Sequence, residues 1–225
     1  MSSILVTGGA SGLGHAIVDT LLRAGQQPAV LDLKPPRFDV PYQAVDLADT
    51  RAAQEAVEAL AAETGGLRAV VTAAGIDSPG RLSDVDRDDW ERVVLVNLLG
   101  TAAVVRAALP ELRRTRGHVV TVASTLGLRA LSDATAYCAA KFGVVGFTRA
   151  LAAELGDEVG VTLLIPGGMR TPFFDGRDEQ YRPGADAALN DPAHVADAVI
   201  FALSQPAGCA VRELVICPSL ESSYP

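Results

Sequence analysis

The sequence predicts a single α/β domain in which a parallel sheet of about seven strands is covered by helices on both faces. The chain has 225 residues, which suffices for one large domain and is short for two. Its hydrophobic content is 49%, and Ala, Val and Leu, together with Gly, dominate the composition, as is typical of parallel sheets under closely packed helices. Short apolar runs alternate with helical patterns along the chain. With no repeat or linker visible, residues 1–225 are expected to form one domain.

The charge and the cysteine content argue against several classes of function. A net charge of −8 lacks the basic surface that nucleic acid requires. The cysteines show no CxxC spacing, and no metal-ligand pattern joins the following residues: Cys138, Cys209, Cys217, His15, His118 and His194. No segment resembles a signal peptide or approaches the ~20 apolar residues of a membrane helix. We therefore expect a cytoplasmic protein that binds no metal, nucleic acid or membrane.

The first predicted strand, 4–7, leads into the glycine-rich turn GGASGLG at 8–14, and a helix follows. Such a turn lets the backbone approach a ligand, and the helix amino end offers free N–H groups to a pyrophosphate. A second strand, 29–32, ends at Asp32, about where a carboxylate that binds the adenosine ribose is expected. Together these features predict a Rossmann-like, doubly wound sheet that binds a dinucleotide.

The middle of the chain continues the alternation of strands and helices. The pattern predicts a strand at 42–45, a helix at 49–63, a strand at 67–72 and a long helix from Asp89 to about Leu109, closed by Pro110. Asn97 lies in the most apolar part of that helix and must find hydrogen-bond partners. It is either a satisfied core amide or a kinked, functional position.

The second half adds the residues that can perform chemistry. The pattern predicts strands at 118–123, 161–165 and 213–217, helices at 133–155 and from 191, and a polar binding loop at 172–190. Ser124 follows a strand at the sheet edge where ligands bind. Tyr137 and Lys141 share one face of a helix. An ammonium favours the phenolate of a tyrosine, and a serine hydroxyl can stabilise a substrate oxygen. The Tyr-x-x-x-Lys spacing alone also fits a half-buried tyrosine beside a solvated lysine.

Six motifs in order are similar to those of the short-chain dehydrogenase/reductase family over nearly the whole chain. They are Thr7-Gly8-x-x-x-Gly12-x-Gly14, Asp46-Leu47, the Asn97 helix, Ser124, Tyr137-x-x-x-Lys141 and Pro166-Gly167 with Thr171. The resemblance implies NAD(P)-dependent interconversion of an alcohol and a ketone. Tyr137 would be the acid–base, Lys141 would lower its pKa, Ser124 would polarise the substrate oxygen, and Asn97 would anchor a proton-relaying water.

The same resemblance implies a set of cofactor-binding residues. Glycines of the turn would line the pyrophosphate, Asp46 and Leu47 would flank the adenine, and Thr171 would contact the nicotinamide end. The full set is Gly8, Ser11, Gly12, Leu13, Gly14, Asp32, Asp46, Leu47, Ala74, Gly75, Tyr137, Lys141, Pro166, Gly167, Met169 and Thr171.

The chain departs from the family pattern in three places. The usual Asn-Asn-Ala-Gly reads Thr72-Ala73-Ala74-Gly75, Arg170 precedes Thr171, and the C-terminus has Cys217-Pro218-Ser219 instead of a glycine-rich ending. The first departure weakens support for the loop after the central strand. The others affect the substrate pocket and subunit contacts, and none removes a catalytic group.

NAD is expected rather than NADP, because Asp32 would repel a 2′-phosphate and Ser11 stands where NADP-preferring relatives often have a basic residue. Lys34 and Arg37 lie nearby and oppose this expectation. The substrate is a small alcohol or ketone, with apolar and anionic substrates both open. Apolar residues on several faces of two helices, together with the relatives, predict a homodimer or homotetramer. The alternatives are an NAD(H)-sensing binding protein and an NAD-bound epimerase or dehydratase.

Overall fold

The computed structural model describes residues 2–206, 208–221 and 223–224. Its seven strands form one parallel sheet in the order β3-β2-β1-β4-β5-β6-β7. The strands are β1 (Ser3–Thr7), β2 (Pro28–Asp32), β3 (Tyr42–Ala44), β4 (Leu67–Thr72), β5 (His118–Val122), β6 (Gly160–Pro166) and β7 (Glu213–Ile216). The α-helices are α1 (Gly12–Arg23), α2 (Thr50–Thr64), α3 (Arg87–Val94), α4 (Thr101–Thr115), α5 (Thr135–Leu155) and α6 (Pro192–Leu203). This confirms the predicted fold class, with element ends displaced by a few residues.

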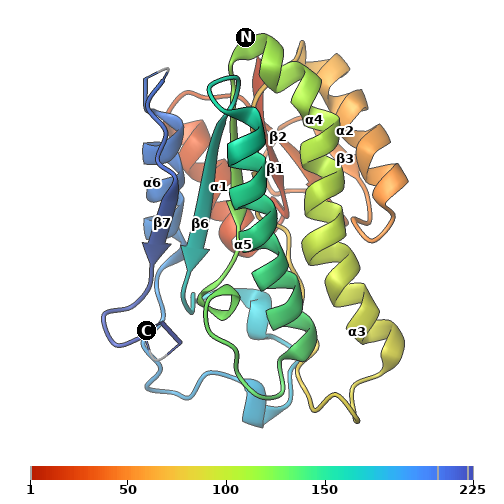
Figure 1. Cartoon of the computed structure of the whole chain (residues 1–225), viewed down its shortest axis with the longest axis vertical. Helices are drawn as coiled ribbons and strands as arrows, with labels where there is room; N and C mark the ends of the chain where they lie inside the picture. The colour runs from red at the N-terminus through yellow and green to blue at the C-terminus, as the bar shows by residue number, and fades with distance from the viewer. Residues whose placement is uncertain (1, 207, 222, 225) are drawn as a thin grey trace.

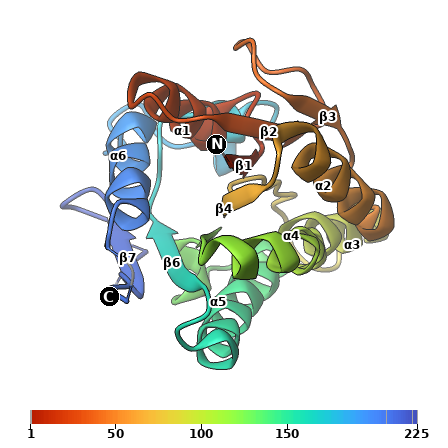
Figure 2. The same cartoon turned by 90° about the horizontal axis from the view of Figure 1, so that it is seen from above.

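The helices form one layer on each face of the sheet. Figure 2 shows α1 and α6 on one side and α2, α4 and α5 on the other. Alternation along β1 explains how one strand serves both layers, since successive side chains point to opposite faces. Ile4 packs in the core with Ile17 of α1 and Val199 of α6, whereas Leu5 packs in the other core with Leu60 of α2. The central strands of the sheet are therefore buried on both sides.

The strand order also determines where a ligand can bind. The chain builds β1, β2 and β3 outward in one direction and then returns to place β4 against the other side of β1. In open α/β sheets, the crevice at such a reversal, beyond the carboxyl ends of the strands, is the usual binding site. Residues 172–190 and the C-terminal tail lie at this end, at the bottom of Figure 1.

The helix predicted at 89–109 is longer and less regular than expected. It runs from Arg87 to Thr115 as α3, a π-helical segment at Leu95–Gly100, and α4. By length and composition alone it could cross a membrane, which the sequence analysis did not anticipate. Half of its most apolar window is buried, and it packs against the sheet, α2 and α5. A core helix of a folded domain passes the same test, so its apolar character is explained by packing.

The prediction that Pro110 closes this helix was wrong, because Pro110 lies inside α4. A proline removes one backbone hydrogen bond and crowds the preceding turn. The last turn nevertheless forms because Leu112 is fully buried in the core beneath it. The helix ends instead at Thr115. Its C-cap residue, Arg116, has a left-handed φ of 48°, and Gly117 comes next in the chain.

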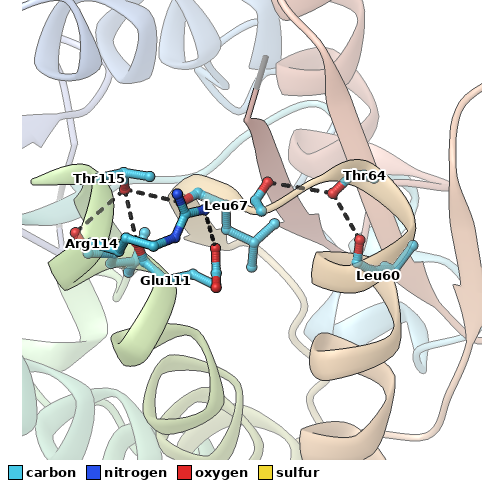
Figure 3. A network of polar contacts seen from close by, with 8 residues as sticks. Leu60, Thr64, Leu67, Glu111, Arg114 and Thr115 are labelled. Atoms are coloured by element: carbon cyan, nitrogen blue, oxygen red, sulfur yellow. Dashed lines mark hydrogen bonds and ion pairs between the residues drawn. The ribbon is translucent and has the colours of Figure 1, made fainter.

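Polar contacts fix the amino end of β4 between α2 and α4 (Figure 3). The Thr115 hydroxyl donates to the carbonyl of Leu67 at 3.0 Å and to that of Glu111 at 3.0 Å. The Thr64 hydroxyl contacts the carbonyl of Leu60 within α2 at 2.7 Å and that of Gly66, just before β4, at 3.4 Å. These contacts lie at the sheet edge opposite the predicted ligand crevice, so they stabilise the fold without taking part in the site.

Candidate active site

A cleft of about 930 Å³ lies at the carboxyl edge of the sheet. Nearly all the site residues predicted from the sequence line it, including Ser124, Tyr137 and Lys141. The predicted cofactor residues that line it are Gly8, Ser11, Gly12, Leu13, Asp32, Asp46, Leu47, Ala74, Gly75, Tyr137, Lys141, Pro166, Gly167, Met169 and Thr171. Gly14 and Asn97 are not among its lining residues. Residues from distant parts of the chain thus converge on one concave surface.

The turn between β1 and α1 requires its glycines for two different reasons. Gly8 and Gly12 have positive φ values of 73° and 53°, which favour glycine. A Cβ atom on Gly14 would overlap the carbonyl group of Gly8, so this position permits the tight turn beneath the cleft. No side chain caps the amino end of α1, where Ser11 is the N-cap residue. The turn therefore leaves backbone N–H groups available for the phosphates of a dinucleotide, which it fits.

Asp32 lies at the end of β2 and faces this turn. Its Oδ2 accepts a hydrogen bond from the backbone N–H of Ala10 at 2.9 Å, and its Oδ1 accepts one from that of Lys34 at 3.0 Å. A carboxylate has further lone pairs, so it can still accept hydrogen bonds from ribose hydroxyls. Lys34 and Arg37 are exposed residues of the loop that follows β2. The carboxylate of Asp32, in contrast, is held in place by its two hydrogen bonds to backbone N–H groups.

Asp46 forms an ion pair that the sequence analysis missed. Its Oδ2 lies 2.8 Å from Nη2 of Arg92 on α3, and its Oδ1 accepts from the backbone N–H of Ala48 at 2.9 Å. Burial tends to raise the pKa of Asp46, but these two contacts outweigh it and hold the pKa below its usual range. Arg92 also lines the cleft. Nothing in the spacing of the sequence pairs Arg92 with Asp46, because packing of α3 brings them together.

Asn97 combines both alternatives raised by the sequence, since it is a satisfied amide and lies in the irregular, π-helical turn. It is almost fully buried. Its Nδ2 donates to the carbonyl of Ile76 at 2.8 Å, and its Oδ1 accepts from the N–H of Ile76 at 2.9 Å. A Cβ atom on Gly75 would lie 3.4 Å from Oδ1 of Asn97 and 3.7 Å from Nζ of Lys141. Asn97 thus holds the loop after β4 beside Lys141.

Ser124, Tyr137 and Lys141 meet at the centre of the cleft. Ser124 follows β5, and its hydroxyl is hydrogen-bonded to the phenol of Tyr137 and accepts from the N–H of Leu126 at 3.1 Å. Lys141 lies one turn after Tyr137 on α5, with Nζ 5.5 Å from the centre of the tyrosine ring. Its ammonium donates to the carbonyl of Val122 at 2.9 Å. The three residues are buried by the fold and nonetheless border the cleft.

Burial shifts the proton affinities of both ionisable groups in this cluster. It raises the pKa of the Tyr137 phenol above its ordinary value of 10, while the hydrogen bond with Ser124 acts in the opposite direction. Burial lowers the pKa of Lys141 from 10.5 to about 8, and the charge of Asp77 counteracts part of this shift. The phenol is thus a proton donor at neutral pH, and Lys141 titrates near working pH. Perturbed groups of this kind in a cleft are typical of an active site.

The segment after β6 closes the cleft and is held by the C-terminal tail, a role that the sequence analysis left open. Oε2 of Glu221 accepts from the backbone N–H of Gly168 at 3.0 Å, and its Oε1 accepts from the hydroxyl of Ser223 at 2.7 Å. That hydroxyl also lies 2.7 Å from Oγ1 of Thr125, next to Ser124. Thr171 lies over the glycine turn, within 3.5 Å of where a Cβ atom on Gly12 would be. The tail thereby connects the two loops that flank the cleft.

A second ion pair borders the cleft beside the catalytic cluster. Nη2 of Arg177, from the 172–190 loop, lies 3.1 Å from Oδ2 of Asp77, which follows the β4 loop. The guanidinium carbon lies 4.6 Å from the ring centre of Phe173, and that ring lies 5.7 Å from the ring of Tyr137. No spacing or motif in the sequence pairs Arg177 with Asp77.

The chain has relatives among known dehydrogenases. A model of the short chain dehydrogenase family matches residues 2–182. An uncharacterized oxidoreductase of Staphylococcus aureus (strain MW2) is 30% identical over 226 residues, which cover 95% of this chain and 96% of that protein. L-fucose dehydrogenase of Mus musculus is 29% identical over 245 residues, covering 98% and 89% of the two chains.

Solved structures have the same fold. The ligand-free aldohexose dehydrogenase of Thermoplasma acidophilum aligns with a TM-score of 0.85 and 22% identity, covering 96% of this chain and 92% of that one. The alcohol dehydrogenase of Thermococcus sibiricus, complexed with 5-hydroxy-NADP, aligns with a TM-score of 0.84 and 23% identity, covering 98% and 97%. With the family match over most of its length, this chain belongs to the short-chain dehydrogenase family of oxidoreductases.

Proposed function

We propose that this protein interconverts a secondary alcohol and a ketone with NAD as the hydride carrier. The observation that carries this proposal is the buried cluster of Ser124, Tyr137 and Lys141 in the same cleft as the glycine turn. When bound, the oxidised nicotinamide supplies an acceptor for the hydride that leaves the alcohol carbon. The residues of the chain then have to bind the substrate oxygen and move one proton.

The proton is handled by Tyr137. In alcohol oxidation its phenolate accepts the hydroxyl proton of the substrate, and in ketone reduction its phenol returns that proton to the carbonyl oxygen. The nearby ammonium of Lys141 stabilises the phenolate when it forms. The Ser124 hydroxyl, already hydrogen-bonded to Tyr137, can also donate to the substrate oxygen as negative charge develops there. The 172–190 loop, which borders the cleft, is proposed to be the substrate loop.

Replacing Tyr137 with phenylalanine tests this proposal. The variant loses only the ionisable oxygen, so we expect NAD to bind with nearly unchanged affinity while kcat falls by ~100- to 10,000-fold. NADH absorbance measures turnover on secondary alcohols and ketones, and protein fluorescence measures cofactor binding. Tyr224→Phe, in the exposed tail, is the matched control. Near wild-type kcat in Tyr137→Phe would refute the proposed role.

The preference for NAD rests on Asp32, because its backbone-fixed carboxylate would repel the 2′-phosphate of NADP. We expect kcat/KM to favour NAD by at least tenfold, equivalent to ~1.4 kcal/mol. Asp32→Ala should reduce this preference, with Asp39→Ala in the following exposed loop as the control. A wild-type preference for NADP would mean that Asp32 is not the ribose ligand.

A further inference from the structure

The pair formed by Asp77 and Arg177 is more deeply buried than the other ion pairs of the described residues. The exposed fractions of the two side chains are 6% and 11%, whereas the remaining pairs join half-exposed surface groups. Moving two charges out of water is costly, and an ion pair recovers that cost only when the remaining polar atoms are also satisfied. This pair therefore needs an explanation beyond stability.

Neither charged group is fully satisfied. Within the described part of the chain, the buried Oδ1 of Asp77 and Nη2 of Arg177 have no partner with hydrogen-bond geometry, although Nη2 is in ion-pair contact with Oδ2 and the backbone N–H of Ser78 acts on the carboxyl group. Both residues line the cleft, and this acceptor and this donor lie just beneath its surface. Buried polar atoms without partners are rare in folded proteins, and each one indicates either strain or a missing ligand.

The surroundings restrict the chemistry of such a ligand. An anionic substrate would have to approach the carboxylate of Asp77 in order to reach Arg177. A purely apolar substrate would leave both polar atoms without partners, which is unfavourable. A hydroxyl group satisfies both, because it can donate to Oδ1 and accept from Nη2. The rings of Phe173 and Phe174, which pack on the guanidinium, also supply an apolar wall.

We propose that Asp77 and Arg177 determine specificity by binding a hydroxyl group close to the reacting carbon, so that the substrate is a neutral polyhydroxylated compound such as a vicinal diol or a sugar. This inference rests on the proposed dehydrogenase function and names the substrate class of the same site. Phe173 contacts both parts of the site, since its ring packs against Tyr137 and against the guanidinium of Arg177. The charges of Asp77 and Arg177 both act on the phenol of Tyr137, so we expect a second hydroxyl to reach the pair while the first reaches Tyr137 and Ser124.

The test compares three six-membered ring substrates with NAD: cyclohexanol, cis-1,2-cyclohexanediol and 2-hydroxycyclohexanecarboxylate. The wild type should prefer the diol over the monoalcohol by tenfold or more in kcat/KM. Asp77→Asn should lower that ratio by at least tenfold, and Arg177→Gln should lower it in the same direction. Asp197→Asn, an exposed carboxylate of α6 that does not line the cleft, is the matched control and should leave the ratio unchanged. The ratio cancels any effect that Asp77 has on Tyr137 or Lys141.

Two outcomes overturn the inference while the dehydrogenase function stands. In the first, Asp77→Asn changes the two alcohols equally, which would make the pair a contact that holds the loop. In the second, Asp77→Asn mainly improves turnover of the hydroxy acid, which would make Arg177 an anion site.

Calorimetry provides a readout that does not depend on turnover. Tyr137→Phe saturated with NAD should bind the diol at least tenfold more tightly than cyclohexanol, and adding Asp77→Asn should abolish that difference. Equal binding of the diol and the monoalcohol would overturn the inference. If no compound turns over in the wild type, the proposed function fails, and this binding comparison still decides the role of the pair.

Discussion

In the ligand-free wild type, Lys141 should make the free energy of unfolding depend on pH. The Lys141→Met variant should lack this contribution. The pKa of Lys141 is lowered from 10.5 to about 8 by burial, with Asp77 opposing the shift. Below pH 8, the folded and unfolded states both carry the proton, so the cost of burying the ammonium is fully present. Between the two pKa values only the unfolded state holds the proton, and stability therefore rises with pH. Above 10.5 both states are neutral and the cost has disappeared.

The magnitude follows from the two pKa values. The whole shift corresponds to roughly 3 kcal/mol, and about 2 kcal/mol of it develops between pH 7 and pH 9.5. We therefore expect the free energy of unfolding of the wild type, relative to Lys141→Met, to increase by about 2 kcal/mol over this range. For a chain of this size, that difference equals roughly 4–8 °C in Tm.

Urea unfolding of the two proteins at pH 7 and pH 9.5 measures this difference. Other groups that titrate in the range are common to both proteins and largely cancel. The chain contains one other lysine, Lys34, which is exposed, so Lys34→Met is the matched control and should unfold in parallel with the wild type at both pH values. The contrary result is a difference in unfolding free energy between the wild type and Lys141→Met that changes by less than about 0.5 kcal/mol between pH 7 and pH 9.5. That result would show that the pKa of Lys141 is not lowered, and the reasoning from burial would fail.

Two further predictions concern the fold and the assembly. Asn97→Ala leaves both backbone groups of Ile76 without their buried partners, so urea unfolding should show that the free energy of unfolding falls by about 2–4 kcal/mol. Asn190 makes a single, longer side-chain hydrogen bond, so Asn190→Ala should lower it by less than about 1 kcal/mol. Equal losses in the two variants would contradict this account. We also propose that the protein is a homodimer or homotetramer that buries Phe142 and Leu99, which are 45% and 46% exposed. Phe142→Glu should then lower the mass measured by light scattering, Leu82→Glu should not, and a monomeric wild type would disprove the proposal.

The sequence predicted the fold well where the pattern is local. Alternation in β1, glycines at a strand end and the apolar face of α1 are determined by neighbouring residues, so their periodicity identifies the element. Pro110 shows the limit of this approach. Its local tendency to end a helix is outweighed by the burial of Leu112 and by the contact between Thr115 and β4, and both depend on distant parts of the chain.

The site was predictable to the extent that its residues follow parallel strands. Ser124, Asp32 and the glycines all occupy strand ends, and parallel strands bring such ends together at one edge. Partners that arrive from elsewhere were missed. Arg92 reaches Asp46 from a helix, and Glu221 reaches Gly168 from the tail. Arg177 reaches Asp77 from an irregular loop. Each pairing depends on packing that no local pattern encodes.

The position of the 172–190 loop and the proton affinity of Lys141 are linked through Asp77. Burial lowers the pKa of both Arg177 and Lys141, and the charge of the Asp77 carboxylate opposes that shift in each of them. We propose that the loop can move outward to admit ligands; Arg177 would then leave Asp77, and the negative charge would act on Lys141 with less compensation. The pKa of Lys141 should then rise from its value in the closed structure. On this proposal, closure of the loop would weaken the effect of Asp77 on Lys141 and lower the pKa of Lys141, at the same time as the cleft becomes shielded from water.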